Sequence, residues 1–507
     1  MINFLIKIIF ISLIFSTRVY NDNLDITLDN NRSCAERPIL DNTLISPSGN
    51  FLIHFNDYYE GIFEYANEVA IAADSSQKVI VDMMNFRNHI ADSDNLYDIY
   101  IKQLPNGSYG WNCPEGDSGA SWVEIDDDYV GSNYSTSGLN AMKISVAHEY
   151  FHAIQRAYVP IPGQNSFFYE LSSIWIEDLV YPDIDDYIFF SQYGDDYFSN
   201  PERNMNSYNG YGLGLYGHYL NSNFDNQIMQ RIWEAYSLIS ENSIIDNESV
   251  FDAINGVLSS EEFSYNSSFI DTWIDFNSKN LFNGTYQTNS NLHYYVDQVF
   301  FNPINTNPVQ IDTVEIISRN LNNKSVKINS FYPYDISLVN IIDNSNSNNI
   351  LCNLCIISDD NEIINFEDSY ESGILSSNDL FHTIFIANTD NDEADFLLNT
   401  TLLNLDFSND IYIYPNPTDS EANLTIRFNS GVKSDNVLLK LYNINGQKLK
   451  NINLGSIDYT TNEYNFKTIN LFNINFSSGI YILSFEFDDK IVNKKITLLK
   501  WHIYIRI

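Results

Sequence analysis

Two histidines and a glutamate near residue 150 have the types and spacing that could carry out metal-assisted hydrolysis. They belong to the HExxH motif His148-Glu149-Tyr150-Phe151-His152, inside a run with helical character. In a helix, residues four positions apart share a face, so His148 and His152 can bind one ion while Glu149 reaches a water molecule beside it. This pattern is typical of zinc hydrolases. The alternative is two surface histidines on an ordinary helix, but with only 8 histidines in 507 residues composition alone seldom produces the motif.

A catalytic zinc ion takes three protein ligands and keeps a fourth position for water, whose pKa it lowers to about 7. The nearest candidate for the third ligand is Glu170, at the start of the next predicted helix. Glu177 lies two turns further along nearly the same face, so it could bind the ion or support another ligand. We favour Glu170. Glu149 would act as general base, taking a proton from the zinc-activated water as it attacks the scissile carbonyl and passing it to the leaving amine.

Two helices must position these side chains. The motif helix is predicted from about residue 139 to 158, between a loop rich in Ser and Gly and a stop at 159–163. The helix that carries Glu170 is predicted over 168–180, closed by Tyr181-Pro182. The sequence therefore predicts that the site lies between two consecutive helices.

Apolar periodicity predicts the other elements of the same domain. Strands are expected at 50–55, 98–104 and 120–126, and helices at 60–73, 208–220, 226–240, 248–255 and 260–277. The strand at 120–126 comes just before the motif helix, where metallopeptidases often have a sheet edge that binds an extended substrate. It could equally be an ordinary sheet strand. We expect an α+β domain over residues 48–285.

Two other groups of residues could bind metals or form disulfides. Cys352 and Cys355 have the CxxC spacing, but a zinc ribbon needs a second pair, so a local disulfide or a reduced pair is favoured over a redox site. Cys34 and Cys113 are left to pair or to remain free. The acidic run 126–128 could hold Ca²⁺. In a chain this acidic, we favour a solvated turn.

Composition and the N-terminus indicate where the protein works. Hydrophobic residues make up 44% of the chain and aromatic residues 15%, which predicts several folded domains. The net charge of −40 repels polyanions, so we expect no nucleic-acid partner. Residues 1–20 have the basic start, apolar core and small residues of a signal peptide, and 21–47 form a leader or arm. No later run is long enough to span a bilayer, so we expect no transmembrane anchor.

The central motifs resemble the gluzincin metallopeptidases, in which the third zinc ligand is a Glu on the helix after HExxH. The run ELSSIWIED at 170–178 also resembles the E-x-x-A-x-W-x-E-D pattern of exported bacterial metallopeptidases with HEYFHAIQ-like motifs. The resemblance implies a zincin-like fold, a protein or peptide substrate, and Zn²⁺ bound by His148, His152 and Glu170. Ile174 stands where the thermolysin branch has an Asp, so the supporting carboxylate of that branch is absent.

A donor to the oxyanion of the transition state is suggested by a second, more local resemblance. The run YGLGLYGHYL at 211–220 is similar to the helix that carries the oxyanion-binding Tyr in the aminopeptidase branch of gluzincins. The resemblance implies this catalytic role for Tyr211. With 35 tyrosines in the chain, a packing Tyr is an equal alternative. His218 is the second candidate donor, although a core or surface histidine is the favoured reading.

The C-terminal part is predicted to be all β. From about residue 291, short alternating strands predict a β-sandwich-like accessory module over 286–405, and a second all-β module follows over 406–500. The runs YPNP at 414–417, LKLYNINGQKL at 439–449, SGIYIL at 478–483 and KKITLLK at 494–500 resemble the C-terminal sorting domain of type IX secretion cargo. That resemblance implies the type IX secretion machinery as a partner. Residues 501–507 form an atypical tail.

These predictions combine into a multi-domain bacterial protein, secreted or attached to the cell surface. An α+β zincin-like metallopeptidase domain is followed by a β-sandwich-like module and a C-terminal all-β sorting domain. The expected function is zinc-dependent hydrolysis of peptide bonds. The alternative is a cell-surface binding or adhesion protein whose zinc site is structural or inactive. Glu149 distinguishes the two, because a structural site does not need a general base.

Overall fold

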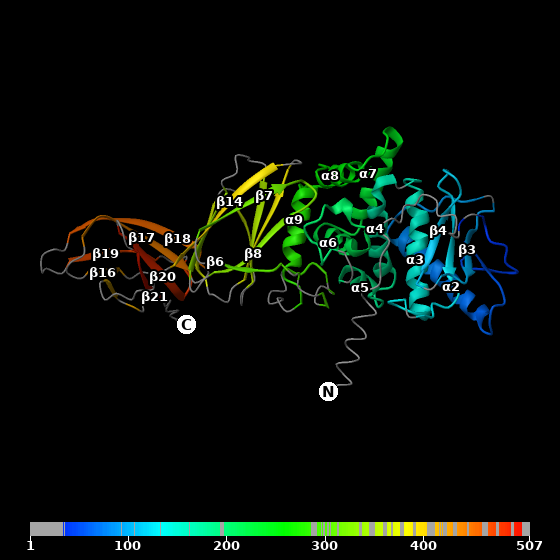
Figure 1. The fold of residues 1–507 in the computed structure, drawn as a ribbon, viewed down its shortest axis with the longest axis horizontal. Coiled ribbons are helices and arrows are strands. Elements are labelled where there is room, and N and C mark those ends of the chain that lie inside the picture. The colour runs from blue at the N-terminus through cyan, green and yellow to red at the C-terminus, as the bar shows by residue number, and fades with distance from the viewer. Residues whose placement is uncertain are drawn as a thin grey trace, which may run out of the picture. The chain divides into compact units, whose positions relative to one another are not determined.

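The computed structural model describes residues 34–498 with gaps, the longest at 285–291, 344–349, 403–410 and 459–464. The predicted signal peptide at 1–20 and the tail at 501–507 lie outside the described residues. The chain forms two compact units, which meet in the sequence at Asn305 and Thr306. The first unit is α+β and the second consists of several sheets (Figure 1). No helix among the described residues is long and apolar enough to cross a membrane.

The first unit contains one five-stranded mixed sheet. Its order is β1 (Asn42–Ile45), β2 (Phe51–Phe55), β3 (Tyr97–Lys102), β5 (Ser121–Asp126) and β4 (Gly110–Pro114). The strands β2, β3 and β5 are parallel, whereas β1 and β4 run antiparallel to their neighbours. The strand β1 comes from the segment predicted as a leader or arm. The predicted strand at 120–126 corresponds to β5, which is paired on both sides, so the expectation of a sheet edge there is wrong and the edge beside it is β4.

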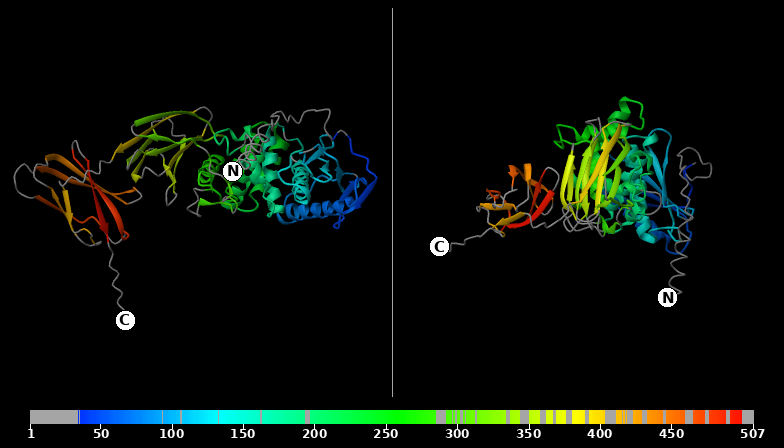
Figure 2. Two further views of the ribbon diagram at one scale, coloured as in Figure 1. Left: turned by 60° about the horizontal axis from the view of Figure 1, so that its bottom comes forward. Right: turned by 60° about the vertical axis from the view of Figure 1, so that its left-hand side comes forward.

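Alternating side chains explain how this sheet joins the core. The residues of β2 alternate between buried and partly exposed positions, and Phe51 and Ile53 are fully buried. The helix α2 (Ile62–Gln77) packs against β2, and α3 (Gly138–Arg156) packs against β4 and β5 (Figures 1 and 2). The sheet therefore supports the motif helix directly.

The remaining helices of the first unit follow the motif helix in the chain. They are α4 (Ser166–Val180), α5 (Asp186–Gln192), α6 (Gly214–Asn223), α7 (Ile228–Asn242), α8 (Ser249–Leu258) and α9 (Phe269–Asn280). A π-helical turn (Lys78–Met83) follows α2, and short 3₁₀ turns lie at Gly163–Asn165, Met205–Ser207 and Tyr211–Leu213. Trp175, Trp233 and Trp273, one each from α4, α7 and α9, are fully buried. Large aromatic side chains thus form the centre of the helical part.

Two predicted helices begin later than the apolar pattern indicates. The segment predicted at 208–220 becomes α-helical only at Gly214, because Gly210 has a φ of 102° and the 3₁₀ turn Tyr211–Leu213 intervenes. The segment predicted at 260–277 becomes helical at Phe269. There Ser268 and Asp271 form a capping box, which satisfies the first backbone N–H groups and fixes the helix start.

Within its described residues, the second unit contains four antiparallel or mixed sheets. Two have the strand orders β11-β10-β13-β8-β6 and β12-β9-β14-β7, and two have the orders β15-β16-β19 and β18-β17-β20-β21. The strands of the first two sheets are β6 (Val309–Ile311), β7 (Val314–Leu321), β8 (Lys327–Pro333), β9 (Ser337–Asp343), β10 (Ile350–Ile357), β11 (Glu362–Phe366), β12 (Ser369–Leu375), β13 (Leu380–Ala387) and β14 (Asp392–Leu402).

The last seven strands form the C-terminal all-β region. They are β15 (Ile411–Tyr414), β16 (Leu424–Phe428), β17 (Lys433–Asn443), β18 (Lys448–Asp458), β19 (Asn465–Ile469), β20 (Gly479–Glu486) and β21 (Ile491–Leu498). Both sheets of this region contribute to one apolar core, which contains Ile426 of β16, Leu441 of β17 and Leu483 of β20. The expected all-β region at the C-terminus is therefore present.

The four cysteines divide into one disulfide and two thiols that are not in a disulfide. Cys34 is bonded to Cys113 of β4. Cys352 and Cys355 are both buried within β10, and neither forms a disulfide. Residues three apart in a strand point to opposite faces of the sheet, so these two side chains cannot approach each other. The reduced pair is observed and the local disulfide is not.

Two of the three aspartates in the acidic run at the end of β5 are buried. Asp126 is buried and accepts hydrogen bonds from the backbone N–H groups of Leu104, at 2.9 Å, and Tyr129, at 2.8 Å. Asp127 is also buried, and burial together with Asp126 and Asp128 raises its pKa to about 6. The expectation of a solvated turn is therefore wrong for the first two residues, because their carboxylates face the protein.

Candidate metal centre

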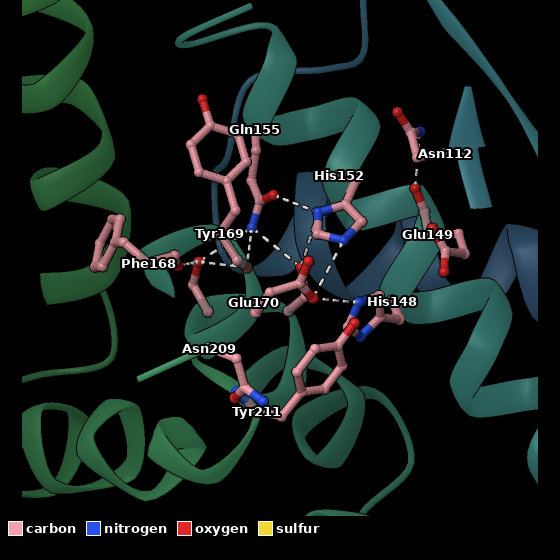
Figure 3. A network of polar contacts seen from close by, with 12 residues as sticks. Asn112, His148, Glu149, His152, Gln155, Phe168, Tyr169, Glu170, Asn209 and Tyr211 are labelled. Atoms are coloured by element: carbon pink, nitrogen blue, oxygen red, sulfur yellow. Dashed lines mark hydrogen bonds and ion pairs between the residues drawn. The ribbon is translucent and has the colours of Figure 1, made fainter. Parts of the chain in front are cut away.

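The helices α3 and α4 bring the two histidines and the first candidate glutamate together. His148 and His152 lie in α3, and Glu170 lies near the start of α4. One donor atom from each of these three residues lies within 4.8 Å of the other two (Figure 3). The arrangement offers two imidazole nitrogens and one carboxylate oxygen to a common point, which is the donor set that catalytic zinc uses.

Both histidines turn the same ring nitrogen toward Glu170. The Oε2 atom of Glu170 lies 3.1 Å from Nε2 of His148 and 3.7 Å from Nε2 of His152. The two rings are nearly perpendicular, with centroids 4.7 Å apart. His148 is 7% exposed, so the pair lies just below the protein surface.

The other ring nitrogen of His148 is held by Glu177. The Nδ1–H of His148 donates to Oε1 of Glu177 at 2.5 Å. A carboxylate on Nδ1 fixes the ring orientation and directs Nε2 toward Glu170, as is usual for a histidine that binds a metal through Nε2. Glu177, which the sequence left open as an alternative ligand, therefore contacts the side of His148 that faces away from Glu170.

His152 is held in the same sense by an amide. Its Nδ1–H donates to Oε1 of Gln155 at 2.7 Å, and Oγ of Ser173 lies 3.3 Å from the same nitrogen. Gln155 is fully buried, and its Nε2 donates to the backbone carbonyl of Tyr169 at 2.8 Å (Figure 3). This bond turns the amide oxygen toward the histidine. Each histidine thus presents Nε2 to the candidate centre.

The charges at the centre favour a bound cation. Burial would raise the pKa of Glu170, but His152 and His148 outweigh it and hold that pKa well below its usual range. Burial lowers the pKa of His148, yet Glu170 and Glu177 reverse this effect and raise it well above the ordinary value. Burial raises the pKa of Glu177 to about 7, against the lowering effect of His148. Carboxylates therefore dominate the field around the two imidazoles.

Glu149 lies on the sheet side of α3, next to the edge strand β4. It is 7% exposed, and its backbone carbonyl accepts a hydrogen bond from Nδ2 of Asn112 at 3.0 Å. Gly110 of β4 lies so close that an added Cβ would be 2.8 Å from Cγ of Glu149. Burial raises the pKa of Glu149, while His148 and His152 act in the opposite direction. A raised carboxyl pKa suits a general base that must both take and return a proton.

Tyr211 lies beside the histidines, as Figure 3 shows. Its ring is stacked parallel to that of His148, with centroids 6.0 Å apart and an interplanar angle of 8°. The preceding Gly210 makes this approach possible, because a Cβ there would lie 2.1 Å from the carbonyl oxygen of Phe167 and 2.8 Å from Cβ of Glu170. The lack of a side chain at Gly210 thus brings Tyr211 to the start of α4.

His218, the second candidate donor, belongs to a different cluster. It is 1% exposed, its Nε2 lies 3.5 Å from Oδ2 of Asp178, and its ring stacks on Tyr295. Burial lowers the pKa of His218 to about 3, so its ring is neutral. None of its contacts among the described residues is with the HExxH residues.

Three residues that support the site were not predicted from the sequence. Gln155 lies one helical turn after His152, which is a weak signal for a contact between them. Asn112 and Ser173 carry no sequence signal, because their roles depend on how β4 and α4 pack against α3. Asn112 is itself held by Arg156, whose Nε donates to Oδ1 of the asparagine at 2.6 Å.

Comparison with known proteins identifies the C-terminal region. Residues 412–499 match the family described as the secretion system C-terminal sorting domain. This range covers most of the motifs that resemble type IX secretion cargo. The chain is therefore a secreted or cell-surface bacterial protein, and its sorting domain implies an interaction with the type IX secretion machinery.

Other comparisons add no information about the first unit. No curated protein matches the chain. Among solved structures, the chain is similar to a beta-glucuronidase from Parabacteroides merdae, at 9% identity and a TM-score of 0.14, over 38% of this chain and 29% of that one. The same enzyme with glycerol in its active site gives 8% identity, a TM-score of 0.14, and 38% and 28% coverage. The chain spans less than a third of the length of that enzyme, and TM-scores this low carry no argument about the fold.

Proposed function

We propose that the protein is a secreted zinc-dependent metallopeptidase of the gluzincin type, with a zincin-like first unit. The observation that carries the proposal is the convergence of Nε2 of His148, Nε2 of His152 and a carboxylate oxygen of Glu170 within 4.8 Å of one another. Two nitrogens and one carboxylate oxygen, with Glu149 next to them in the same helix, match the requirements of a hydrolytic zinc site.

The residues present fit a zinc ion. His148, His152 and Glu170 would hold it, with Glu177 and Gln155 fixing the two imidazoles through their Nδ1 atoms. When bound, the ion would polarise the scissile carbonyl and make water acidic enough to be a nucleophile near neutral pH.

Within this mechanism Glu149 moves the proton. Its carboxylate accepts a proton from the attacking water and returns it to the leaving amine. The raised pKa of this buried carboxyl supports the first transfer, since a weaker acid has a more basic carboxylate, and the proton it takes up is then passed to the amine as the C–N bond breaks. A structural zinc site in an adhesion protein has no use for such a group beside the ligands.

Tyr211 and β4 would act on the substrate. The hydroxyl of Tyr211, on a ring stacked against His148, would donate to the oxyanion that forms at the scissile carbonyl. The strand β4 is the sheet edge next to Glu149, where an extended peptide could add as a further strand. A protein or peptide in extended conformation is therefore the proposed substrate.

The experiment that tests the function measures hydrolysis together with metal removal. We expect the purified full-length chain to cleave an unfolded protein such as reduced casein, to lose this activity when a chelator removes the metal, and to regain it when Zn²⁺ is restored. Fragments would be followed by mass spectrometry. Cleavage that continues unchanged in metal-free protein would contradict the proposal, and so would the absence of cleavage by protein shown to hold zinc at the HExxH site.

A further inference from the structure

Three carboxylates from distant parts of the first unit meet away from the HExxH histidines. Asp178 lies in the last turn of α4, Asp185 lies just before α5, and Asp297 follows α9 in the chain. One carboxylate oxygen from each lies within 4.8 Å of the other two. Burial and the charges of the other two aspartates raise the pKa of Asp178 to about 7. In the described part of the chain, no lysine or arginine pairs with any of the three.

A buried histidine points into this cluster without a hydrogen bond. His218 of α6 is 1% exposed, and neither of its ring nitrogens has a hydrogen-bond partner among the described residues. Its Nε2 lies 3.5 Å from Oδ2 of Asp178. The other oxygen of Asp178, Oδ1, is also buried without a partner. Buried polar atoms are nearly always paired. These atoms are therefore best explained by a bound ligand that the protein chain itself does not supply.

Two tyrosines orient the cluster from outside. The hydroxyl of Tyr295 donates to Oδ2 of Asp178, and the ring of Tyr295 stacks on His218 with centroids 3.8 Å apart. The hydroxyl of Tyr187 donates to Oδ2 of Asp297 at 3.0 Å. Hydrogen bonds of this kind fix carboxylates that bind a metal ion. Each of these carboxylate oxygens keeps a second lone pair, with which it can also contact a metal ion.

We propose that Asp178, Asp185, Asp297 and His218 bind a second divalent metal ion, separate from the ion expected at the HExxH site. Two ligand atoms that each lie about 2.1 Å from a tetrahedral ion are roughly 3.4 Å apart. This value is close to the 3.5 Å between Nε2 of His218 and Oδ2 of Asp178. Carboxylates combined with an imidazole suit Mn²⁺ or Zn²⁺, whereas Ca²⁺ and Mg²⁺ take oxygen ligands. A divalent ion would offset two of the negative charges of the three aspartates.

This second ion would join three segments of the first unit. It would tie the end of α4 to the start of α5 and to the segment around residue 297. Asp178 directly follows Glu177, which holds His148. The ion would thus stabilise the part of α4 that supports the HExxH centre, without taking part in the hydrolysis.

The test counts metal ions in a chain whose HExxH site has been removed. The full-length double variant His148→Ala/His152→Ala is first stripped of metal with a chelator. Separate samples are then incubated with Mn²⁺ or Zn²⁺ and freed of unbound metal. The bound metal is measured by elemental mass spectrometry. We expect one bound ion per chain and a higher melting temperature with metal. Adding Asp185→Asn should remove both effects. Asp185 is exposed, so this change leaves the packed core intact.

A neighbouring aspartate supplies the control. Asp183 is exposed in the same loop and is outside the cluster, so adding Asp183→Asn to the double variant should leave metal content and melting temperature unchanged. The proposal is overturned if the double variant retains neither metal, or if Asp185→Asn retains as much as Asp183→Asn. Because the HExxH histidines are absent throughout, either result is independent of the proposed peptidase activity.

Discussion

At the scale of single residues, the carboxylates of α4 differ in which nitrogen of His148 they contact. Glu170 faces Nε2 and Glu177 faces Nδ1. The HExxH spacing and the nearness of Glu170, at the start of the next helix, were enough to predict His148, His152 and Glu170 as neighbours. They could not separate the roles of Glu170 and Glu177, because two turns of helix place both on one face and only the ring orientation decides between them.

Zinc affinity distinguishes these two roles. Glu177→Gln removes only a supporting carboxylate, so we expect zinc binding to weaken about 10- to 100-fold. Glu170→Gln removes a ligand and should weaken it further. Competition with a chromophoric chelator measures both dissociation constants under the same conditions. If Glu177→Gln releases zinc while Glu170→Gln retains it, the third ligand is Glu177.

At the scale of elements, close packing of the segment before α6 against α4 positions Tyr211. Apolar periodicity predicted the helices α3 and α4 within a few residues, because their caps and stops are local. Apolar periodicity predicted one continuous helix at 208–220. The helix is broken at Gly210, which has a φ of 102° and lies close to the carbonyl of Phe167, and periodicity cannot indicate such a long-range contact. The strand β4 was not predicted at all, and its position at the sheet edge depends on contacts between distant residues.

Gly210→Ala tests this packing. The alanine would have to adopt a φ of 102° and place its Cβ 2.1 Å from the Phe167 oxygen, so we expect a loss of stability of at least roughly 1–3 kcal/mol. Thermal unfolding should shift down, and hydrolysis should fall with it because Tyr211 is displaced. Gly256→Ala in α8 is the matched control, with nothing within 4 Å of the added Cβ. An equal loss in both variants would contradict this role for Gly210.

At the scale of the whole molecule, the C-terminal region indicates where the protein is located. The sorting-domain match at 412–499 and the disulfide between Cys34 and Cys113 both fit a protein that functions outside the cytoplasm. The four C-terminal motifs made this region predictable, because each is a short local pattern. The pairing of Cys34 with Cys113 was not predictable, since they lie 79 residues apart.

Deletion of residues 406–507 tests whether the C-terminal sorting domain directs export of the protein. We expect the shortened chain to remain inside the outer membrane of a bacterium with a type IX system, whereas the complete chain reaches the surface or the medium. Immunoblots of the cell fractions measure both. The complete chain carrying Glu149→Gln should be exported like the unaltered one, because the site plays no part in sorting. Export of the shortened chain would show that residues 406–507 are dispensable for secretion.

The central claim is that Glu149 acts as the general base beside a metal held by other residues. The most direct measurement determines zinc content and hydrolysis of an unfolded protein on the same sample of full-length Glu149→Gln, with Glu64→Gln on the exposed side of α2 as control. We predict unchanged zinc content with hydrolysis reduced by about 10²- to 10⁴-fold, and no change in the control. Hydrolysis by Glu149→Gln at the rate of the unaltered chain, with zinc bound, would contradict the mechanism.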